Sequence, residues 1–516
     1  MSITRKAGIL LHPTALPGPC GLGTLGTEVY AFIDYLSLMG ASLWQVLPLT
    51  PTGFGDSPYA ARSVFAGNEL LISMEMLAGE GLVQPEELKR IPAFPRNRVD
   101  FEAVRSWKMP LLMKSADLFL SGGPDQGYLD FCESNRFWLE DYALFMTLTE
   151  YYNGSPCWYD CWDASHRNHD AKELSRFQAS REQEVSRWKV LQYLFFTQWM
   201  GVKNYAHKKG IEIIADVPIF VSADSADAWA CRDLFKTAPD GTFSAQSGVP
   251  PDAFSATGQL WGTPVYDWKH KRSELFSWWI KRIGHTLKSA DRVRLDHFRG
   301  FESYWEIAAG EQTAISGKWV KVPGKQLFKE MRASIGNPSI IAEDLGVITP
   351  EVEHLRDSFQ FPGMKILQFA FELTEDGSLN ADNPYLPHAY QQRCVAYTGT
   401  HDNHTSAGWY ASIDELLRDK VRRYLARPDE DIVWSLIRAV MSSTANDVII
   451  LFQDLFSLGD ETRFNTPSTV GTHNWSWRAI PDLFENRHIP SRFNEMVQLY
   501  GRSPTAFVPP TQENGQ

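Results

Sequence analysis

Three carboxylates in this chain follow short apolar runs, and two of them have a basic neighbour. Asp296 lies two residues after Arg294, Asp402 directly follows His401, and Glu343 ends a run of small and apolar residues. Cleavage of a glycosidic bond requires one carboxylate at the oxocarbenium-like centre and one protonated carboxyl that delivers a proton to the leaving oxygen. The residue types therefore favour chemistry at a sugar linkage.

The surroundings of each acid suggest a separate task. In a strand, Arg294 and Asp296 point to the same face, so the guanidinium favours the ionised form that a nucleophile needs. The apolar run before Glu343 favours desolvation, which raises a carboxyl pKa and keeps the proton on a general acid. Asp402 can accept hydrogen bonds from ring hydroxyls as the sugar flattens.

Other interpretations of these residues stay open. A single acid at a strand end is commonly a capping or ion-pair residue. Metal ligation by His297, His401 and His404 together with the acids is a second alternative. Cys157 and Cys161 have a spacing that zinc can use, but no second pair of ligands follows at a matching spacing. No phosphate-binding glycine motif follows a strand, so we expect neither a cofactor nor a metal.

The sequence patterns around these acids predict an α/β barrel. Short apolar runs ending in polar or glycine-rich residues are typical of buried parallel strands that lead into functional loops. Helical patterns at 27–39 and 414–423 separate some of them, which indicates right-handed crossovers and a parallel sheet. Eight strands close a (β/α)8 TIM barrel. The expected strands are 8–12, 43–49, 212–220, 292–298, 339–345, 364–371, 393–400 and 448–456.

The uneven strand spacing predicts insertions. We interpret 1–516 as one elaborated (β/α)8 catalytic domain, with a mainly helical subdomain inserted at 65–207 after the second strand. A smaller insertion at 221–291 carries a loop, 250–262, that we expect to cover the substrate. Both insertions leave from the C-terminal ends of strands, the face where active sites of such barrels lie.

Composition narrows the class of partner. The formal charge is −12 and no basic block stands out, which argues against nucleic acid and anionic membranes as partners. Neither a run of 18 apolar residues nor a secretion signal is seen. The six scattered cysteines indicate reduced thiols, so we expect a cytoplasmic protein. The 18 Trp and 18 Tyr residues offer rings that can stack on sugars, although core packing explains most of them.

An ordered series of motifs then resembles one family from residue 8 to residue 478. The series includes GILLHPTALPG at 8–18, FGDSPYAARSVFAGN at 54–68, ADVPIFVSADSADAW at 215–229, VRLDHFRGF at 293–301, IAEDLG at 341–346 and YTGTHDNHT at 397–405. The sequence is similar to the 4-α-glucanotransferases, also called amylomaltases or disproportionating enzymes, of the α-amylase clan.

The resemblance implies roles for individual residues. It implies a retaining mechanism with Asp296 as nucleophile, Glu343 as general acid/base and Asp402 as transition-state stabiliser. It further implies three sets of substrate-binding residues: Tyr59, Asp216, Arg294, His297 and His401 at the cleaved bond, Asn465 and Pro467 along the donor chain, and Phe254, Gln259 and Trp261 on the covering loop. Phe54 stands where some relatives have Tyr, which puts an accessory glucan surface there in doubt.

The implied substrates are maltooligosaccharides and other α-1,4-glucans, with glucose or another glucan as acceptor, and the implied assembly is a monomer or homodimer. Three alternatives remain. An α-glucan hydrolase would use the same barrel and acids, a catalytically silent glucan-binding protein would need only the aromatic residues, and a metal-dependent aldolase or isomerase would share only the fold.

Overall fold

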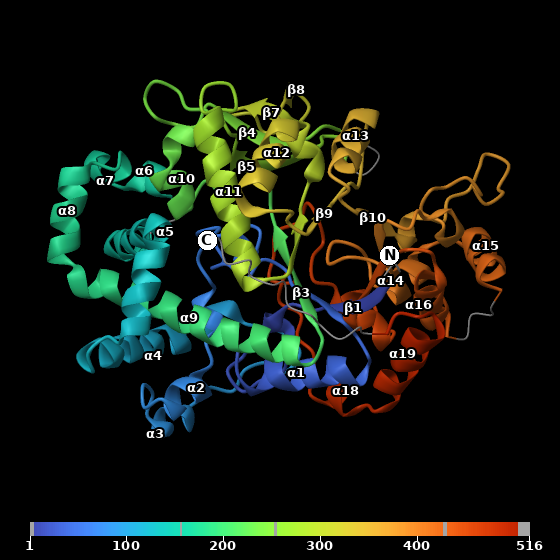
Figure 1. Ribbon diagram of the computed structural model, residues 1–516, viewed down its shortest axis with the longest axis horizontal. Helices are drawn as coiled ribbons and strands as arrows, with labels where there is room; N and C mark the ends of the chain where they lie inside the picture. Colours follow the sequence, from blue (N-terminus) through green and yellow to red (C-terminus); the bar gives the residue numbers. More distant parts are fainter. Residues whose placement is uncertain (1–4, 155–156, 252–254, 427–430, 504–516) are drawn as a thin grey trace.

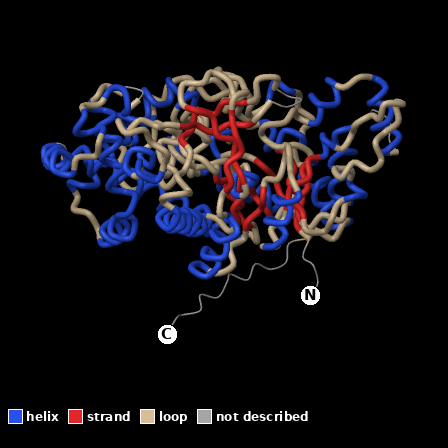
Figure 2. The backbone as a smooth tube through the Cα atoms, turned by 90° about the horizontal axis from the view of Figure 1, so that it is seen from above, coloured by secondary structure: helices blue, strands red, loops and turns tan. Residues whose placement is uncertain are grey.

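A computed structural model describes residues 5–154, 157–251, 255–426 and 431–503, and it contains a parallel eight-stranded barrel. Strands occupy the centre and helices lie around them (Figure 2). Along the sheet the strands follow the order β10, β11, β12, β1, β2, β3, β6, β9. Their bounds are β1 (Lys6–Leu10), β2 (Leu43–Gln45), β3 (Glu212–Val217), β6 (Arg292–Leu295), β9 (Ile340–Ala342), β10 (Gly363–Ile366), β11 (Cys394–Tyr397) and β12 (Asp447–Leu451).

All eight predicted strands are confirmed, and the fold class with them. Every strand ends earlier than predicted, because the residues beyond it lie in irregular loops, turns or short helices. His297, for example, has φ 52° and ends the extended backbone after β6. Residues 452–455 were expected in a strand but form the helix α17 (Phe452–Leu455). Burial therefore continues past the strands into the loops.

The seam of the barrel lies between β9 and β10. The Ala342 N–H donates to the Pro362 carbonyl at 2.9 Å. One residue beyond Glu343, the Asp344 carboxylate accepts the Met364 N–H at 2.7 Å and forms an ion pair with Arg356. A side chain thus takes over the pairing that a longer strand would supply.

Nineteen α-helices lie in the described part of the chain, and no helix there has the length and hydrophobicity of a membrane span. Between β2 and β3 come α2 to α9, which occupy one side of the molecule (Figure 1). The helices are α1 (Thr27–Leu38), α2 (Met74–Gly79), α3 (Pro85–Leu88), α4 (Phe101–Ser121), α5 (Gln126–Tyr151), α6 (Trp158–Cys161), α7 (Ala164–Arg167), α8 (Ala171–Ser180), α9 (Glu182–Lys208), α10 (Ala226–Ala230), α11 (Arg272–Ser289), α12 (Gly324–Ile335), α13 (Pro350–Ser358), α14 (Ser406–Ser412), α15 (Glu415–Leu425), α16 (Ile432–Ser442), α17, α18 (Asp482–Glu485) and α19 (His488–Leu499).

A second sheet, which the sequence patterns did not predict, lies beside the barrel (Figure 1). It is antiparallel, with the order β5, β4, β7, β8. Its strands are β4 (Ala245–Val249), β5 (Gln259–Pro264), β7 (Ser303–Ala308) and β8 (Gly317–Lys321). Because β7 and β8 follow β6, this sheet is connected directly to the turn after Asp296. The proposed division into inserted subdomains stays a prediction.

The seam yields a stability prediction. Asp344→Ala removes the acceptor of a buried N–H and leaves Arg356, whose side chain is 15% exposed, without this partner. We expect the free energy of unfolding to fall by about 2–4 kcal/mol in denaturant titrations. Asp357→Ala removes the exposed second partner of Arg356 and should cost less than about 1 kcal/mol. Equal losses in the two variants would argue against a closing role for Asp344.

Candidate active site

A buried arginine holds two carboxylates at the ends of β3 and β6. The register pairs Asp216 with Arg294 across these strands. The Arg294 Nη1 lies 2.7 Å from Asp216 Oδ2 and 2.9 Å from Asp296 Oδ1. The Arg294 side chain is 3% exposed, whereas that of Asp296 is 30% exposed. The arginine therefore stays hidden and presents Asp296 to the solvent side.

Burial and charge pairing act against each other in this cluster. Burial alone would lower the pKa of Arg294, but the charges of Asp216 and Asp296 outweigh it and raise that pKa well above its ordinary value. Arg294 is therefore a permanent cation. Burial also raises the pKa of Asp216, and the Arg294 charge opposes that rise. The second oxygen of Asp216, Oδ1, is buried without a hydrogen-bond partner among the described residues.

Glu343 comes next to Asp296 because of the turn after β6. The left-handed conformation of His297 directs its backbone N–H to Glu343 Oε2 at 2.7 Å. The Leu345 N–H donates to Oε1 at 3.0 Å. Burial and the negative charge of Asp296 raise the pKa of Glu343 to about 8, although Arg294 and the His297 N–H act in the opposite direction. Glu343 is consequently protonated at neutral pH, as a general acid must be.

Asp402 is held in the opposite protonation state. Its Oδ2 lies 3.2 Å from His401 Nε2, and its Oδ1 accepts a hydrogen bond from Asn465 Nδ2 at 2.6 Å. Burial would raise the pKa of Asp402, but His401 and Asn465 overcome that effect and hold the pKa well below its ordinary value. The Arg463 guanidinium donates to the Asp402 carbonyl at 3.0 Å and fixes the backbone. Asp402 is therefore an ionised and well-oriented carboxylate.

An aromatic group joins the two carboxylate clusters. The Tyr59 hydroxyl donates to Asp216 Oδ2 at 2.8 Å, and its ring stacks on His401 with centroids 5.1 Å apart. Trp475 lies 5.6 Å from the Tyr59 ring and 6.0 Å from the His401 ring. Through Tyr59 and His401, the ends of β3 and β11 line one site.

Strand β5 of the antiparallel sheet lines another side of the site. The edge of the Trp261 ring meets His297 at a centroid distance of 4.8 Å, and its indole N–H donates to Gln259 Oε1 at 3.3 Å. The Trp261 side of this contact is open, since the residue is 37% exposed. Burial lowers the pKa of His297 to about 4, so this imidazole is neutral. Its Nε2 has no hydrogen-bond partner in the part of the chain that the structure describes.

Contacts thus connect most of the predicted site residues. They join Asp296, Glu343, Asp402, Tyr59, Asp216, Arg294, His297, His401, Asn465, Gln259 and Trp261. Pro467 is exposed, two residues after Asn465, and its contact with a donor chain stays a prediction. Phe254 lies outside the described residues. Trp475 and Arg463 were missed, because only the folded loop brings them to the site.

The structure gives the metal alternative no support. Within the described residues, no group of three His, Cys, Asp or Glu side chains is arranged to hold a metal ion. His404 Nδ1 pairs with Asp460 instead of pointing at the acids. Cys157 and Cys161 are free thiols.

Comparison with known proteins identifies the family. The sequence model of the 4-alpha-glucanotransferase family matches residues 11–482. This chain belongs to the 4-alpha-glucanotransferase family. It is 45% identical to a 4-alpha-glucanotransferase of Synechocystis sp., over 96% of this chain and 98% of that protein, and 44% identical to one of Thermus thermophilus, over 95% and 97%. It is also similar to the amylomaltase of Streptococcus agalactiae, solved with acarbose, with a TM-score of 0.91, 36% identity and coverage of 97% of this chain and 100% of that chain.

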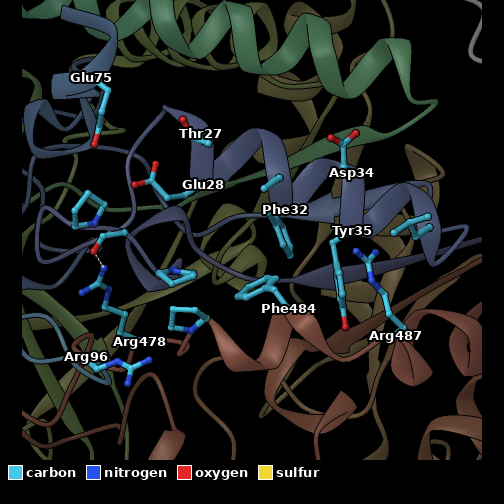
Figure 3. Close-up of a pocket in the computed structure, with 16 residues that line it drawn as sticks. Thr27, Glu28, Phe32, Asp34, Tyr35, Glu75, Arg96, Arg478, Phe484 and Arg487 are labelled. Atoms are coloured by element: carbon cyan, nitrogen blue, oxygen red, sulfur yellow. Dashed lines mark hydrogen bonds between the residues drawn. The ribbon is translucent and has the colours of Figure 1, made fainter. Parts of the chain in front are cut away.

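A separate cleft of about 830 Å³ lies on the outside of the barrel (Figure 3). It runs between α1 and α18, and its lining contains none of the predicted site residues. Phe32, Tyr35 and Phe484 form part of its lining, while Arg96 and Arg487 stand at its side (Figure 3). The carboxylates Asp296, Glu343 and Asp402 therefore lie outside this cleft.

The raised pKa of Glu343 has a measurable consequence for stability. The carboxyl has an ordinary pKa of 4.5 in an unfolded chain and about 8 in the fold, so its contribution to stability is present below pH 4.5 and is lost as the pH rises through 8. Glu343→Gln removes this dependence. Relative to the parent, the variant should gain about 2–4 kcal/mol of unfolding free energy between pH 5 and pH 8.

Denaturant titrations at the two pH values measure this gain. Glu353→Gln, at an exposed position of α13, is the matched control and should show no comparable gain. A difference between Glu343→Gln and the parent that does not change with pH would contradict a raised pKa.

Proposed function

We propose that this chain transfers a segment of an α-1,4-glucan to the 4-hydroxyl of glucose or another glucan, by double displacement through a glycosyl ester on Asp296. One observation carries the proposal. A carboxylate paired with a buried arginine stands next to a carboxyl that its surroundings keep protonated, and the His297 N–H links the two. A retaining glycosidase needs this combination of nucleophile and acid.

In the first half-reaction, an Asp296 oxygen attacks the anomeric carbon. The bond from that carbon to the leaving oxygen breaks, and Glu343 gives its proton to this oxygen. The glycosyl ester that forms carries no charge on Asp296, so the part of the raised pKa of Glu343 that comes from the Asp296 charge disappears, while the part that comes from burial remains. Arg294 and the His297 N–H then oppose burial without the Asp296 charge against them, which lowers the pKa of Glu343 toward the carboxylate form that its next role as a base needs.

The unpaired buried atoms support sugar binding at this site. Asp216 Oδ1, His297 Nε2 and His401 Nδ1 are buried without hydrogen-bond partners in the described ranges. Buried polar atoms of this kind are costly unless a ligand satisfies them. Hydroxyl groups of a sugar ring can donate to Asp216 Oδ1, and they can either donate to or accept from the two imidazole nitrogens. Asp402 is ionised and is placed to interact with the positive charge that develops on the ring.

In the second half-reaction, the ionised Glu343 takes the proton of an acceptor hydroxyl, which attacks the anomeric carbon and releases Asp296. An acceptor sugar must outcompete water, and a well-placed hydroxyl gains an effective molarity of about 10⁵ M or more. Trp261 and Gln259 offer a ring and an amide for holding that acceptor. The acarbose-bound Streptococcus agalactiae amylomaltase supports an oligosaccharide ligand.

Assembly and location remain predictions: a monomer or homodimer that acts in the cytoplasm. Neither the sheet nor the carboxylate cluster requires a second copy to complete the contacts described above.

Incubation with maltotriose tests the transfer. We expect glucose together with maltopentaose and longer products, because each glycosyl-enzyme passes its segment to another sugar. Chromatography of the products over time measures the distribution. Formation of glucose and maltose alone would identify the chain as a hydrolase and refute transfer.

Asp296→Asn tests the nucleophile. Removing the attacking carboxylate should lower kcat at least about 10³-fold, while calorimetric binding of maltoheptaose persists. Asp357→Asn changes an exposed acid of α13 in the same way and should leave kcat unchanged. Undiminished turnover in Asp296→Asn would place the reaction at another site.

A further inference from the structure

The turn between β7 and β8 reaches back to the segment 255–261, which contains Gln259 and Trp261. The Trp305 indole N–H donates to the Ala314 carbonyl at 2.8 Å. The Ala314 N–H in turn donates to the Thr257 carbonyl at 3.0 Å. Ala314 is fully buried between them. The backbone of Ala314 therefore connects one indole on β7 to the segment that leads into β5.

Two glycines permit this close packing. A Cβ atom at Gly317 would lie 2.3 Å from Trp305 Nε1, so the indole rests directly on the backbone of β8. A Cβ atom at Gly258 would lie 2.9 Å from the Ala314 Cβ, and Gly258 also has φ 67°. Larger residues at these positions would displace the indole or the 255–261 segment.

At its other end, the same hairpin touches the loops that follow the catalytic strands. The Trp305 and Trp319 rings meet with centroids 5.2 Å apart. The Arg299 guanidinium lies 3.8 Å from the Trp319 ring centroid and donates to the Val347 carbonyl. Arg299 is three residues after Asp296, and Val347 is four residues after Glu343. The hairpin is thus fixed to both loops.

The contacts form a closed circuit. From the loop after Asp296, they pass through Arg299, Trp319, Trp305 and Ala314 to Thr257, and the 255–261 segment then returns to the loop through the contact of Trp261 with His297. The position of Trp261 at the site consequently depends on the hydrogen bond from the Trp305 indole to the Ala314 carbonyl, although neither residue contacts Trp261 directly in this circuit.

We propose that Trp305 is a positioning residue that, through Ala314, holds the 255–261 segment in place for the sugar acceptor and so favours transfer over hydrolysis. This inference rests on the proposed function. Trp305 acts only through Trp261 and Gln259. Weakening its support should therefore leave attack by Asp296 in place but allow water to compete better for the glycosyl ester, since acceptor orientation supplies much of the advantage over water.

Two variants disturb this support independently. Trp305→Phe keeps an aromatic ring and removes the N–H. Gly317→Ala keeps the indole but adds a methyl group that displaces it from the backbone of β8. With maltotriose as donor and isotopically labelled glucose as acceptor, so that the transfer product is distinguishable from the donor, we expect the ratio of transfer to hydrolysis to fall about 3- to 10-fold in both variants, as the loss of one hydrogen bond allows. The KM for glucose should rise, while the rate of reducing-end release changes less than about twofold.

Trp199→Phe is the matched control, because it removes an indole N–H that donates to the Ser289 carbonyl at 2.9 Å, in contacts of α9 and not of the second sheet. Its transfer ratio and glucose KM should equal those of the parent. If Trp305→Phe and Gly317→Ala also keep the parent's ratio and KM, or if the control loses as much as they do, the positioning role of Trp305 is overturned. A parent enzyme that itself fails to transfer would overturn the proposed function instead. The parent sample thus tests the proposed function, and the variant samples test the role of Trp305.

Discussion

The site depends on one buried guanidinium placed between two carboxylates. Burying the charge of Arg294 without partners would be prohibitive, and the ion pairs with Asp216 and Asp296 offset that cost. The pairing of β3 with β6 sets the geometry, because it places Asp216 opposite Arg294 in register. The ion pairs of Arg294 therefore connect the strand pairing inside the barrel to the position of Asp296 at the candidate site.

From this constraint follows a division of protonation states within a small volume. Burial raises the pKa of Glu343, and the negative charge of Asp296, which pairs with Arg294, adds to that rise. Asp402 escapes this effect because His401 and Asn465 contact it separately. A carboxyl whose pKa is raised, Glu343, and a carboxylate whose pKa is lowered, Asp402, thus lie at the same strand-end surface, each because of its own surroundings.

The eight barrel strands could be predicted because strands buried on both faces read as continuous apolar runs; all five residues of β12 are buried, for instance. Their acids could be placed because strand ends meet on one face of such a barrel. The second sheet could not, since β8 is largely exposed and carries no apolar run. Trp475 was equally hidden from sequence reasoning: it has φ 62°, and its place beside Tyr59 depends on how the chain folds around it.

Asp344 at the seam and Glu343 at the candidate site are consecutive residues just beyond β9, and their carboxyl groups have different partners: Asp344 accepts the Met364 N–H, whereas Glu343 accepts those of His297 and Leu345. Sliding β9 by a single position against its neighbours would move Glu343 away from the N–H groups of His297 and Leu345 and, at the same step, withdraw the group that accepts the Met364 N–H. A misaligned chain would therefore lose both the arrangement of the candidate site and the closure of the barrel. Correct alignment of β9 thus closes the barrel and positions Glu343 in one step of folding.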